Sequence, residues 1–183
     1  MLSYPLTDDA EMRALEPWNA AEFAAYIERD RAHLSPWLPW AKALTDEEAT
    51  REWLQRYANR VAVDDGRIYG IWLDGDLAGG TLFRVFDQRF GTAEIGVWLS
   101  PAAGGRGLIT KAAERMIAYV FAERGLNRIE WRCVPTNERS IAAAKRLGLT
   151  RDGVLREAFP YEGKNHDVEI WSLLAREWRV QTQ

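Results

Sequence analysis

A cluster of glycines in the middle of the chain has the composition of a phosphate-binding loop. The stretch GGRGLITKA, residues 104–112, follows the strand-like run EIGVWLS and precedes a long helical pattern. A strand that runs into a glycine loop and then into a helix leaves backbone N–H groups at the positive end of the helix dipole, where an anionic phosphate binds. Several cofactor classes share this chemistry, so the loop alone does not identify its ligand.

Three interpretations of the loop have different sequence requirements. A Walker A motif needs lysine directly after its last glycine, but no lysine directly follows Gly105 or Gly107, and Lys111 falls within the helical pattern. A dinucleotide-binding fingerprint has Thr110 where it needs its third glycine, and the loop follows three predicted strands instead of the opening strand of a parallel sheet. The glycines can also serve only a tight turn. A nucleotide kinase is therefore disfavoured, and the dinucleotide interpretation is weakened.

Side chains that could transfer protons lie on segments near the loop. Asn137 and Ser140, in TNERS, open a predicted helix, where such residues commonly cap the first turn. Glu94 lies on the strand before the loop and Glu157 on the penultimate predicted strand, and each could be a proton acceptor or an ordinary surface carboxylate. Cys133, the only cysteine, is expected to be a small buried residue and not a nucleophile.

The composition limits the function classes. The chain has 183 residues, 47% apolar and 28% charged, which predicts one globular domain over residues 1–183. A net charge of −3 argues against a general nucleic-acid binder. The N-terminal stretch has neither a basic start nor an apolar run, and no window is long enough for a membrane span, so we expect a cytoplasmic protein without a membrane partner. A single cysteine excludes a zinc site built from several thiolates, and we expect no metal.

Hydrophobic periodicity predicts the elements that must position these residues. Helical spacing covers residues 19–34, with Asn19 as N-cap, and residues 45–62, with Thr45 and Glu48 as a capping box. Three strand-like runs follow as an antiparallel meander: RIYGIWL, LAGGTLFRVF and AEIGVWLS. After the loop come a helix ending at Gly125, the strand NRIEWRCVP, a helix stopped by Gly148, and two strands.

This order predicts a mixed sheet of the α/β (α+β) class. Its first part is antiparallel, and the helix after the glycine loop leads to a parallel neighbour. The stretch SPWLPWA, which contains Trp37 and Trp40, reads as a loop among prolines. Its rings either cover the core or line a pocket.

Three runs in this order resemble one family. AEIGVWLSPAAGGRGLITKA, VPTNERSIAAAKRLGL and LREAFPYEGKNHDVEIWSLL resemble the GNAT acyltransferases, in particular their RimJ/RimL-like protein N-acetyltransferase branch, and HLSPWLPWA resembles an N-terminal signature of that branch. The resemblance covers almost the whole chain. It implies a central mixed, mostly antiparallel sheet with a splayed strand pair, flanked by helices, and acetyl-coenzyme A as the acetyl donor.

The resemblance also implies which residues hold the donor. Backbone amides of the loop would bind the pyrophosphate, and free backbone groups of the preceding strand would pair with the pantetheine amides. The loop departs from the family pattern Q/R-x-x-G-x-G/A at its first and last positions. Asn137 of TNERS would contact the pantetheine arm, and the hydroxyl of Ser140 would protonate the departing thiolate. The implied residues are Val97, Trp98, Leu99, Gly104, Gly105, Arg106, Gly107, Leu108, Ile109, Thr110, Asn137 and Ser140.

Acetyl transfer to an amine needs a deprotonated amine, a supported oxyanion and a protonated leaving group. Direct attack by the amine suffices, without a covalent intermediate. The glutamate that is thought to act as base in the branch aligns with Phe159, so the candidates for the base are Glu157, two residues earlier and on the same strand face, Glu94, and an ordered water. Rings at Trp37, Trp40 and Phe159 could stack on a flat acceptor.

The acceptor stays open at this point. It could be the N-terminal amine of a protein such as a ribosomal protein, a small amine, an antibiotic or an aminoacyl nucleotide, and the donor could carry a larger acyl group. A homodimer is allowed. Two alternatives are a non-catalytic domain that binds coenzyme A as a sensor or partner module, and a nucleotide-dependent oxidoreductase that uses the incomplete dinucleotide fingerprint.

Overall fold

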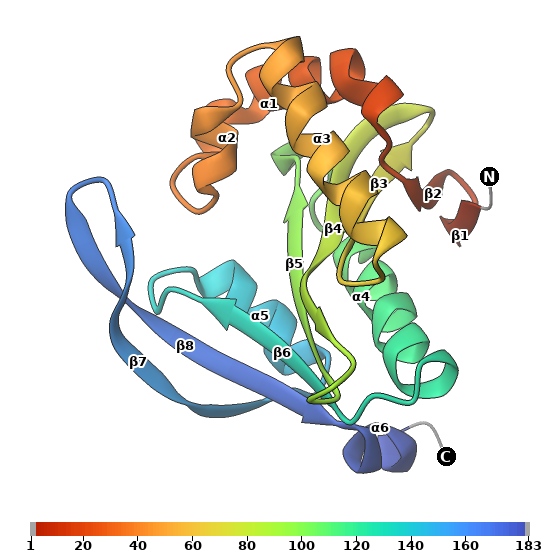
Figure 1. The fold of residues 1–183 in the computed structure, drawn as a ribbon, viewed down its shortest axis with the longest axis vertical. Coiled ribbons are helices and arrows are strands. Elements are labelled where there is room, and N and C mark those ends of the chain that lie inside the picture. Colours follow the sequence, from red (N-terminus) through yellow and green to blue (C-terminus); the bar gives the residue numbers. More distant parts are fainter. Residues whose placement is uncertain (1–2, 182–183) are drawn as a thin grey trace. The chain divides into compact units, whose positions relative to one another are not determined.

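The computed structural model describes residues 3–181, in which helices and strands follow the order drawn in Figure 1. The strands are β1 Ser3–Thr7, β2 Ala10–Ala14, β3 Arg67–Leu73, β4 Asp76–Asp87, β5 Thr92–Leu99, β6 Arg128–Cys133, β7 Thr150–Tyr161 and β8 Lys164–Leu174. The helices are α1 Ala20–Leu34, α2 Pro39–Ala43, α3 Glu47–Ala62, α4 Leu108–Ala118, α5 Glu138–Arg146 and α6 Ala175–Gln181. A π-helical turn, Tyr119–Glu123, extends α4.

The chain divides into two compact units, each assembled from separated stretches. The first unit contains the chain up to Leu82 together with Val97–Ala112, and the second contains Phe83–Gly96 and the chain from Ala113 onward. The passages between the units lie inside β4, β5 and α4. The single domain expected from the sequence stays a prediction.

The strands form an eight-stranded sheet in the order β1-β2-β3-β4-β5-β6-β8-β7. β2 is antiparallel to β1 and β3, β8 is antiparallel to β6 and β7, and β5 is parallel to β6. A parallel pair needs a crossover connection, which α4 supplies. The predicted mixed, mostly antiparallel sheet is confirmed.

The ladder between β5 and β6 is short. It covers three residue pairs and ends at Glu94 and Glu130. β5 nevertheless continues to Leu99, and β6 continues to Cys133. Both strands thus extend beyond the last residues that they pair with each other.

The first unit buries apolar side chains on both faces of its strands. On one face, Phe23 of α1 and Leu54 of α3 pack with Trp72 of β3, and each is at most 1% exposed. On the other face, Ile71 of the same strand packs with Leu108 at the start of α4. Consecutive strand residues point to opposite faces, and full burial of one such side chain stabilises by about 1.5–3 kcal/mol. The start of α4 is therefore fixed by the core beneath it.

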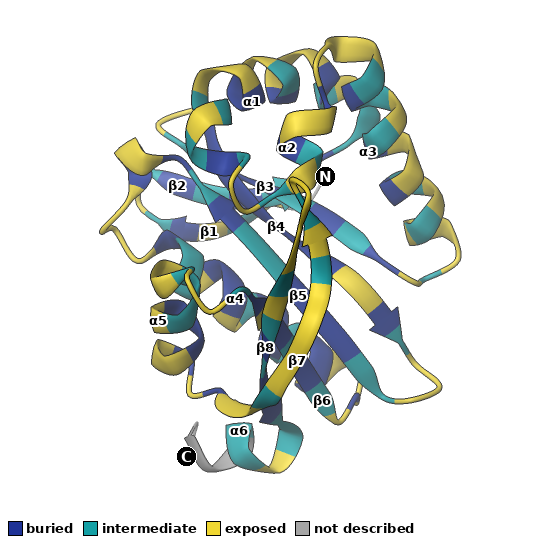
Figure 2. Ribbon diagram, turned by 90° about the vertical axis from the view of Figure 1, so that its left-hand side faces the viewer, coloured by how far each residue is buried: buried dark blue, intermediate teal, exposed yellow. Residues whose placement is uncertain are grey.

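Aromatic contacts connect the strands and helices of the second unit to one another. The ring of Phe83 lies 5.1 Å from that of Phe86 and 6.1 Å from that of Tyr119. In α6, Trp178 packs against Phe121 with ring centroids 5.6 Å apart. Figure 2 shows β7 exposed along most of its length, in contrast to β8, which has buried positions toward its C-terminal end.

Several short elements differ from the sequence prediction. The hairpin β1–β2 and the helix α6 were not predicted, because five to seven residues give too little periodicity for an assignment. The stretch predicted as a loop contains α2, which has Pro39 in its first turn, where proline is tolerated. The predicted cap at Thr45 is wrong. Asp46 caps α3 instead, and its carboxylate accepts a hydrogen bond from the amide of Ala49 at 2.8 Å.

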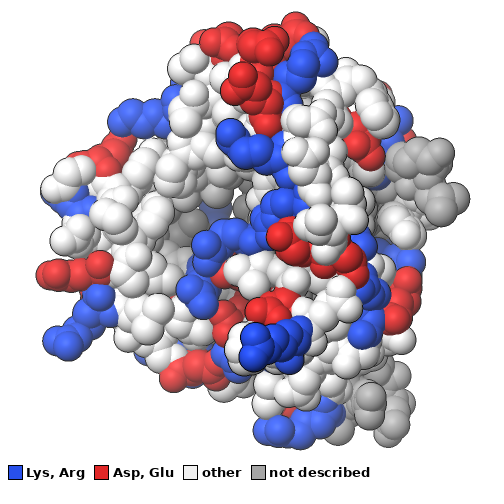
Figure 3. All heavy atoms as spheres, viewed as in Figure 1, with Lys and Arg blue, Asp and Glu red and all other residues white. Residues whose placement is uncertain are grey.

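Two further properties of the described chain concern membrane-spanning helices and surface charge. Within residues 3–181, every helix is too short or too polar to cross a membrane. Acidic and basic side chains are interspersed on the face drawn in Figure 3, in keeping with the net charge of −3.

Gly80 of β4 lies too close to its neighbouring strands to accept a side chain, which predicts a loss of stability on substitution. A Cβ atom there would lie 2.3 Å from the ring of Trp98 and 2.5 Å from the carbonyl oxygen of Tyr69. Gly80→Ala should lower the free energy of unfolding by about 1–3 kcal/mol, because overpacking forces buried groups apart. Urea denaturation measures the change. In the control Gly153→Ala the new Cβ meets nothing within 4 Å, so its stability should stay within about 0.5 kcal/mol of the parent. Equal stabilities of the two variants would contradict this packing.

Candidate functional site

The glycine loop is a tight turn that leads into α4. The amide of Gly104 donates to the carbonyl of Pro101 at 3.1 Å, and Gly105 and Gly107 have φ angles of +78° and +73°. The helical bonding begins with the amide of Lys111, which donates to the carbonyl of Gly107 at 3.0 Å. The amides ahead of it have no carbonyl of their own helix to bind. The loop therefore presents backbone donors at the positive end of α4.

The surroundings of the loop fit a phosphate group. A Cβ atom built on Gly105 or Gly107 would meet nothing within 4 Å, so neither glycine is needed to avoid a clash within the protein. The positive φ angles explain both glycines, because residues with side chains rarely adopt them. The same conformation leaves open space beside the loop, into which a bulky anion can fit.

Arg106 connects the loop to the N-terminal hairpin. Its guanidinium forms an ion pair with Asp9, in the turn between β1 and β2. The hydroxyl of Thr7 donates to the same carboxylate at 2.7 Å, and this hydrogen bond, together with Arg106, holds the pKa of Asp9 below its usual value. The hairpin that was missing from the sequence prediction thus restrains the loop.

At the end of β5, the side chain of Trp98 is buried in the core, which leaves the backbone of this residue for contacts with a ligand. Trp98 is 4% exposed and packs against Trp40 and Phe23, with ring centroids 5.2 and 6.1 Å apart. Val97 and Leu99, on either side, are partly exposed. Donor contacts at Trp98 would therefore have to come from its backbone groups.

A polar cluster missed by sequence reasoning lies just after this strand segment. The hydroxyl of Ser100 donates to the carboxylate of Asp30, and Arg29 donates to Ser100 Oγ at 3.1 Å and to the carbonyl of Leu77 at 3.0 Å. The amide of Ser100 also donates to the carbonyl of Ala78 at 2.7 Å. The partners lie about 70 residues from Ser100 in α1, so no local pattern could have indicated the cluster.

The three predicted stacking residues have different surroundings. Trp40 belongs to the aromatic cluster of the first unit, 5.7 Å from Phe23 and 5.4 Å from Trp53, whereas Trp37 is 37% exposed. Phe159 belongs to the second unit, where it stacks on Tyr161 at 5.4 Å. Trp40 is thus partly buried against the core, and an acceptor role for these residues stays a prediction.

The start of α5 brings together the residues predicted from TNERS. Asn137 caps the helix, and its side-chain oxygen accepts a hydrogen bond from the amide of Ser140 at 3.1 Å. The indole N–H of Trp131 donates to Ser140 Oγ at 2.8 Å. Since an indole N–H is only a donor, the hydroxyl hydrogen of Ser140 can be donated to a different acceptor, and the sulfur of Cys133 is one such neighbour.

Cys133 lies beside Ser140 and has the properties of an unreactive thiol. It is 8% exposed, and burial raises its pKa to about 11, although a hydrogen bond with Ser140 acts in the opposite direction. The thiolate is the reactive form, and at neutral pH almost none is present. The environment therefore agrees with the expectation that Cys133 is not a nucleophile.

Glu157 lies in an irregular part of β7. The register with β8 shifts between Leu155 and Phe159, and Glu157 has a φ angle of +51°. Its amide donates to the carboxylate of Asp167 at 2.8 Å. The expectation that Glu157 shares a strand face with Phe159 assumed regular alternation, which this bulge interrupts. Its assignment as base no longer follows from strand parity.

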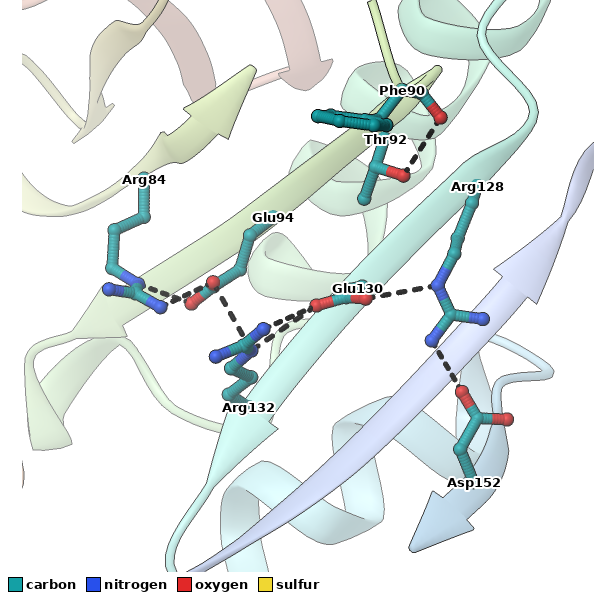
Figure 4. A network of polar contacts seen from close by, with 8 residues as sticks. All are labelled: Arg84, Phe90, Thr92, Glu94, Arg128, Glu130, Arg132 and Asp152. Atoms are coloured by element: carbon teal, nitrogen blue, oxygen red, sulfur yellow. Dashed lines mark hydrogen bonds and ion pairs between the residues drawn. The ribbon is translucent and has the colours of Figure 1, made fainter. Parts of the chain in front are cut away.

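Glu94 is engaged by arginines. Its carboxylate is bound by Arg84, with one contact at 2.5 Å from Nη2, and it lies 3.4 Å from Nε of Arg132 (Figure 4). Sequence reasoning missed both arginines. Arg84 lies on β4, ten residues before Glu94, and the sequence alone does not give the strand register that brings the two side chains together.

No group of three or more His, Cys, Asp or Glu side chains within residues 3–181 is placed to hold a metal ion. The site therefore consists of backbone donors, hydroxyls, carboxylates and aromatic rings. These are groups that bind an anionic ligand and transfer protons without a metal.

Comparisons with known proteins agree with this chemistry. A family model described as an acetyltransferase (GNAT) domain matches residues 11–150. The chain is 32% identical over 183 residues to the putative ribosomal N-acetyltransferase YdaF of Bacillus subtilis (strain 168). The alignment covers 97% of this chain and 98% of that protein.

Solved structures show the same fold. A probable acetyltransferase, 30% identical, superposes with a TM-score of 0.86 over 97% of this chain and 99% of that one. RimL, a ribosomal L7/L12 alpha-N-protein acetyltransferase in complex with coenzyme A, is 24% identical and has a TM-score of 0.89 over 96% of this chain and 99% of that one. Because the family model covers well over half of its length, the chain belongs to the acetyltransferase (GNAT) domain family and is an N-acetyltransferase with acetyl-coenzyme A as its donor.

Proposed function

We propose that the acceptor is the N-terminal amine of a protein, with a ribosomal protein as the first candidate. The observation that carries the proposal is the 32% identity to a protein named as a putative ribosomal N-acetyltransferase, which extends over nearly the full length of both chains. RimL, a ribosomal L7/L12 alpha-N-protein acetyltransferase, shares the fold.

Donor binding is assigned to backbone groups of the first unit. Loop residues 105–110 hold the pyrophosphate through their amides and the dipole of α4. The backbone of Val97–Leu99 pairs with the amides of the pantetheine arm, as an added strand would. Acetyl-coenzyme A supplies an activated thioester, so the protein needs only to bind it, orient it and manage protons.

Proton transfer is assigned to the second unit. The hydroxyl of Ser140, whose oxygen already accepts from Trp131, donates its hydrogen to the leaving sulfur, and Asn137 binds the pantetheine arm. Removal of the amine proton falls to an ordered water or to Glu157. Both carboxylate oxygens of Glu94 already have arginine partners, which disfavours Glu94 as the base.

The remaining partners follow from the same proposal. The protein acts in the cytoplasm on acetyl-coenzyme A and a protein or peptide amine, without a nucleic-acid or membrane partner. Assembly into a homodimer stays a prediction.

A thiol-release screen tests the acceptor. It compares N-terminal peptides of ribosomal proteins with polyamines, aminoglycosides and aminoacyl nucleotides. We expect the highest kcat/KM for a peptide with a free N-terminus, and no turnover of the same peptide when its N-terminus is blocked and only an internal lysine remains. Preference for an aminoglycoside or an aminoacyl nucleotide by about tenfold, or 1.4 kcal/mol, would overturn the proposed acceptor.

Gly107→Asp tests the loop. The side chain would strain a backbone with a φ angle of +73° and would place a negative charge where the pyrophosphate binds. Calorimetry should show that affinity for acetyl-coenzyme A falls by more than about tenfold. Gly75→Asp is the matched control, since its φ angle is +89° and its surroundings are equally open, but it lies in the turn between β3 and β4. Unchanged affinity in Gly107→Asp would refute the loop assignment.

Ser140→Ala tests the proton donor. We expect kcat to fall by about 10²–10⁴ where chemistry limits the rate, because general-acid catalysis is lost. Affinity for acetyl-coenzyme A should change little. Thr136→Ala removes an exposed hydroxyl from the same loop and should keep the parent kcat. Parent-like turnover in Ser140→Ala would show that another group protonates the thiolate.

A further inference from the structure

The carboxylate of Glu94 lies where the pairing between β5 and β6 stops. The last pair of that ladder is Glu94 and Glu130. The Glu94 side chain is 7% exposed, yet Arg84 of β4 contacts it from one side and Arg132 of β6 from the other. One carboxylate thus connects the central strand to both of its neighbours, as Figure 4 shows.

The neighbouring ion pairs do not join β5 to β6: they lie within β6 or connect β6 to β7. Glu130 pairs with Arg128 at 3.0 Å and Arg132 at 2.9 Å, all within β6, and Arg128 pairs with Asp152 of β7 at 2.5 Å. Burial alone would raise the pKa of Glu130, but the two arginines outweigh it and hold the pKa below its usual value. The Glu94–Arg132 pair is the contact of this network that joins β5 to β6.

These contacts disfavour Glu94 as a general base. A base must offer an open lone pair and then hold a proton. Here both oxygens of a nearly buried carboxylate have charged partners. Protonation would remove the charge that makes these hydrogen bonds strong.

We propose that Glu94 is a positioning residue for the acetyl donor. Held by Arg84 and Arg132, it fixes β5 at the last paired residue, just before the strand continues to Val97–Leu99. An ion pair on the face of the sheet then sets the distance between β5, whose backbone binds the donor, and its neighbour β6. The inference rests on the proposed donor-binding role of Val97–Leu99, and it is independent of the acceptor.

Glu94→Gln and Arg132→Gln break the same cross-strand pair from its two ends. We expect the dissociation constant and the KM for acetyl-coenzyme A to rise by about tenfold in each, as for the loss of a charged hydrogen bond. kcat should fall less than about threefold, and the acidic limb of the pH–rate profile should stay in place. Each variant also removes a second ion pair, Glu94 with Arg84 or Arg132 with Glu130. The double variant should therefore lose less affinity than the sum of the two single losses, because the Glu94–Arg132 pair is lost only once.

Two controls separate this role from general damage. Asp152→Asn removes an ion pair at the β7 end of the same network and should leave the KM for acetyl-coenzyme A unchanged, and Arg132→Lys should restore part of the affinity lost in Arg132→Gln. The Arg132 side chain is 36% exposed, so its variants should fold even if Glu94→Gln does not.

Two results would overturn the inference. The first is parent-like donor affinity in both glutamine variants. The second is a loss of kcat of about 100-fold in Glu94→Gln, with unchanged KM and a lost acidic limb, which would identify Glu94 as the base. Calorimetry with acetyl-coenzyme A needs no acceptor, so failure of the ribosomal-protein proposal would leave this test intact.

Discussion

The parallel ladder between β5 and β6 stops after three residue pairs, and the rest of the site depends on that limit. Backbone groups that lack a neighbouring strand must find another partner, and an extended ligand with amides of its own is a suitable one. A parallel pair also requires a crossover, here α4, whose N-terminus is the positive end of the helix dipole. The strand proposed to bind the donor and the loop proposed to bind its phosphates are therefore consecutive consequences of one sheet topology.

The strand, loop and helix at the centre of this arrangement were predictable from the sequence. The alternating run that became β5, the glycines with positive φ angles and the amphipathic α4 each give a strong local signal. The cap formed by Asn137 was also predicted and is present. The elements that were missed, β1, β2, α2 and α6, are all short, so their stability comes from packing that no local pattern records.

The predictable part of the site ends at the side-chain partners. The contact between Arg84 and Glu94 depends on the register of two neighbouring strands, and the bond from Ser100 to Asp30 joins residues that only the folded chain brings together. Glu157 shows a third case. In a regular strand, residues two positions apart point to the same face. This rule fails at Glu157, because a bulge interrupts the alternation.

The passages between the two compact units have a consequence for how this enzyme can change. Each passage lies inside a strand or a helix, at β4, β5 and α4, and none lies in a linker. No single cut of the gene would yield one intact unit, and Val97–Ala112 is covalently attached at both ends to residues of the other unit. Exchange of one whole unit with a related enzyme would need breaks inside β4, β5 and α4. Neither unit can therefore be passed on as one contiguous segment of the gene.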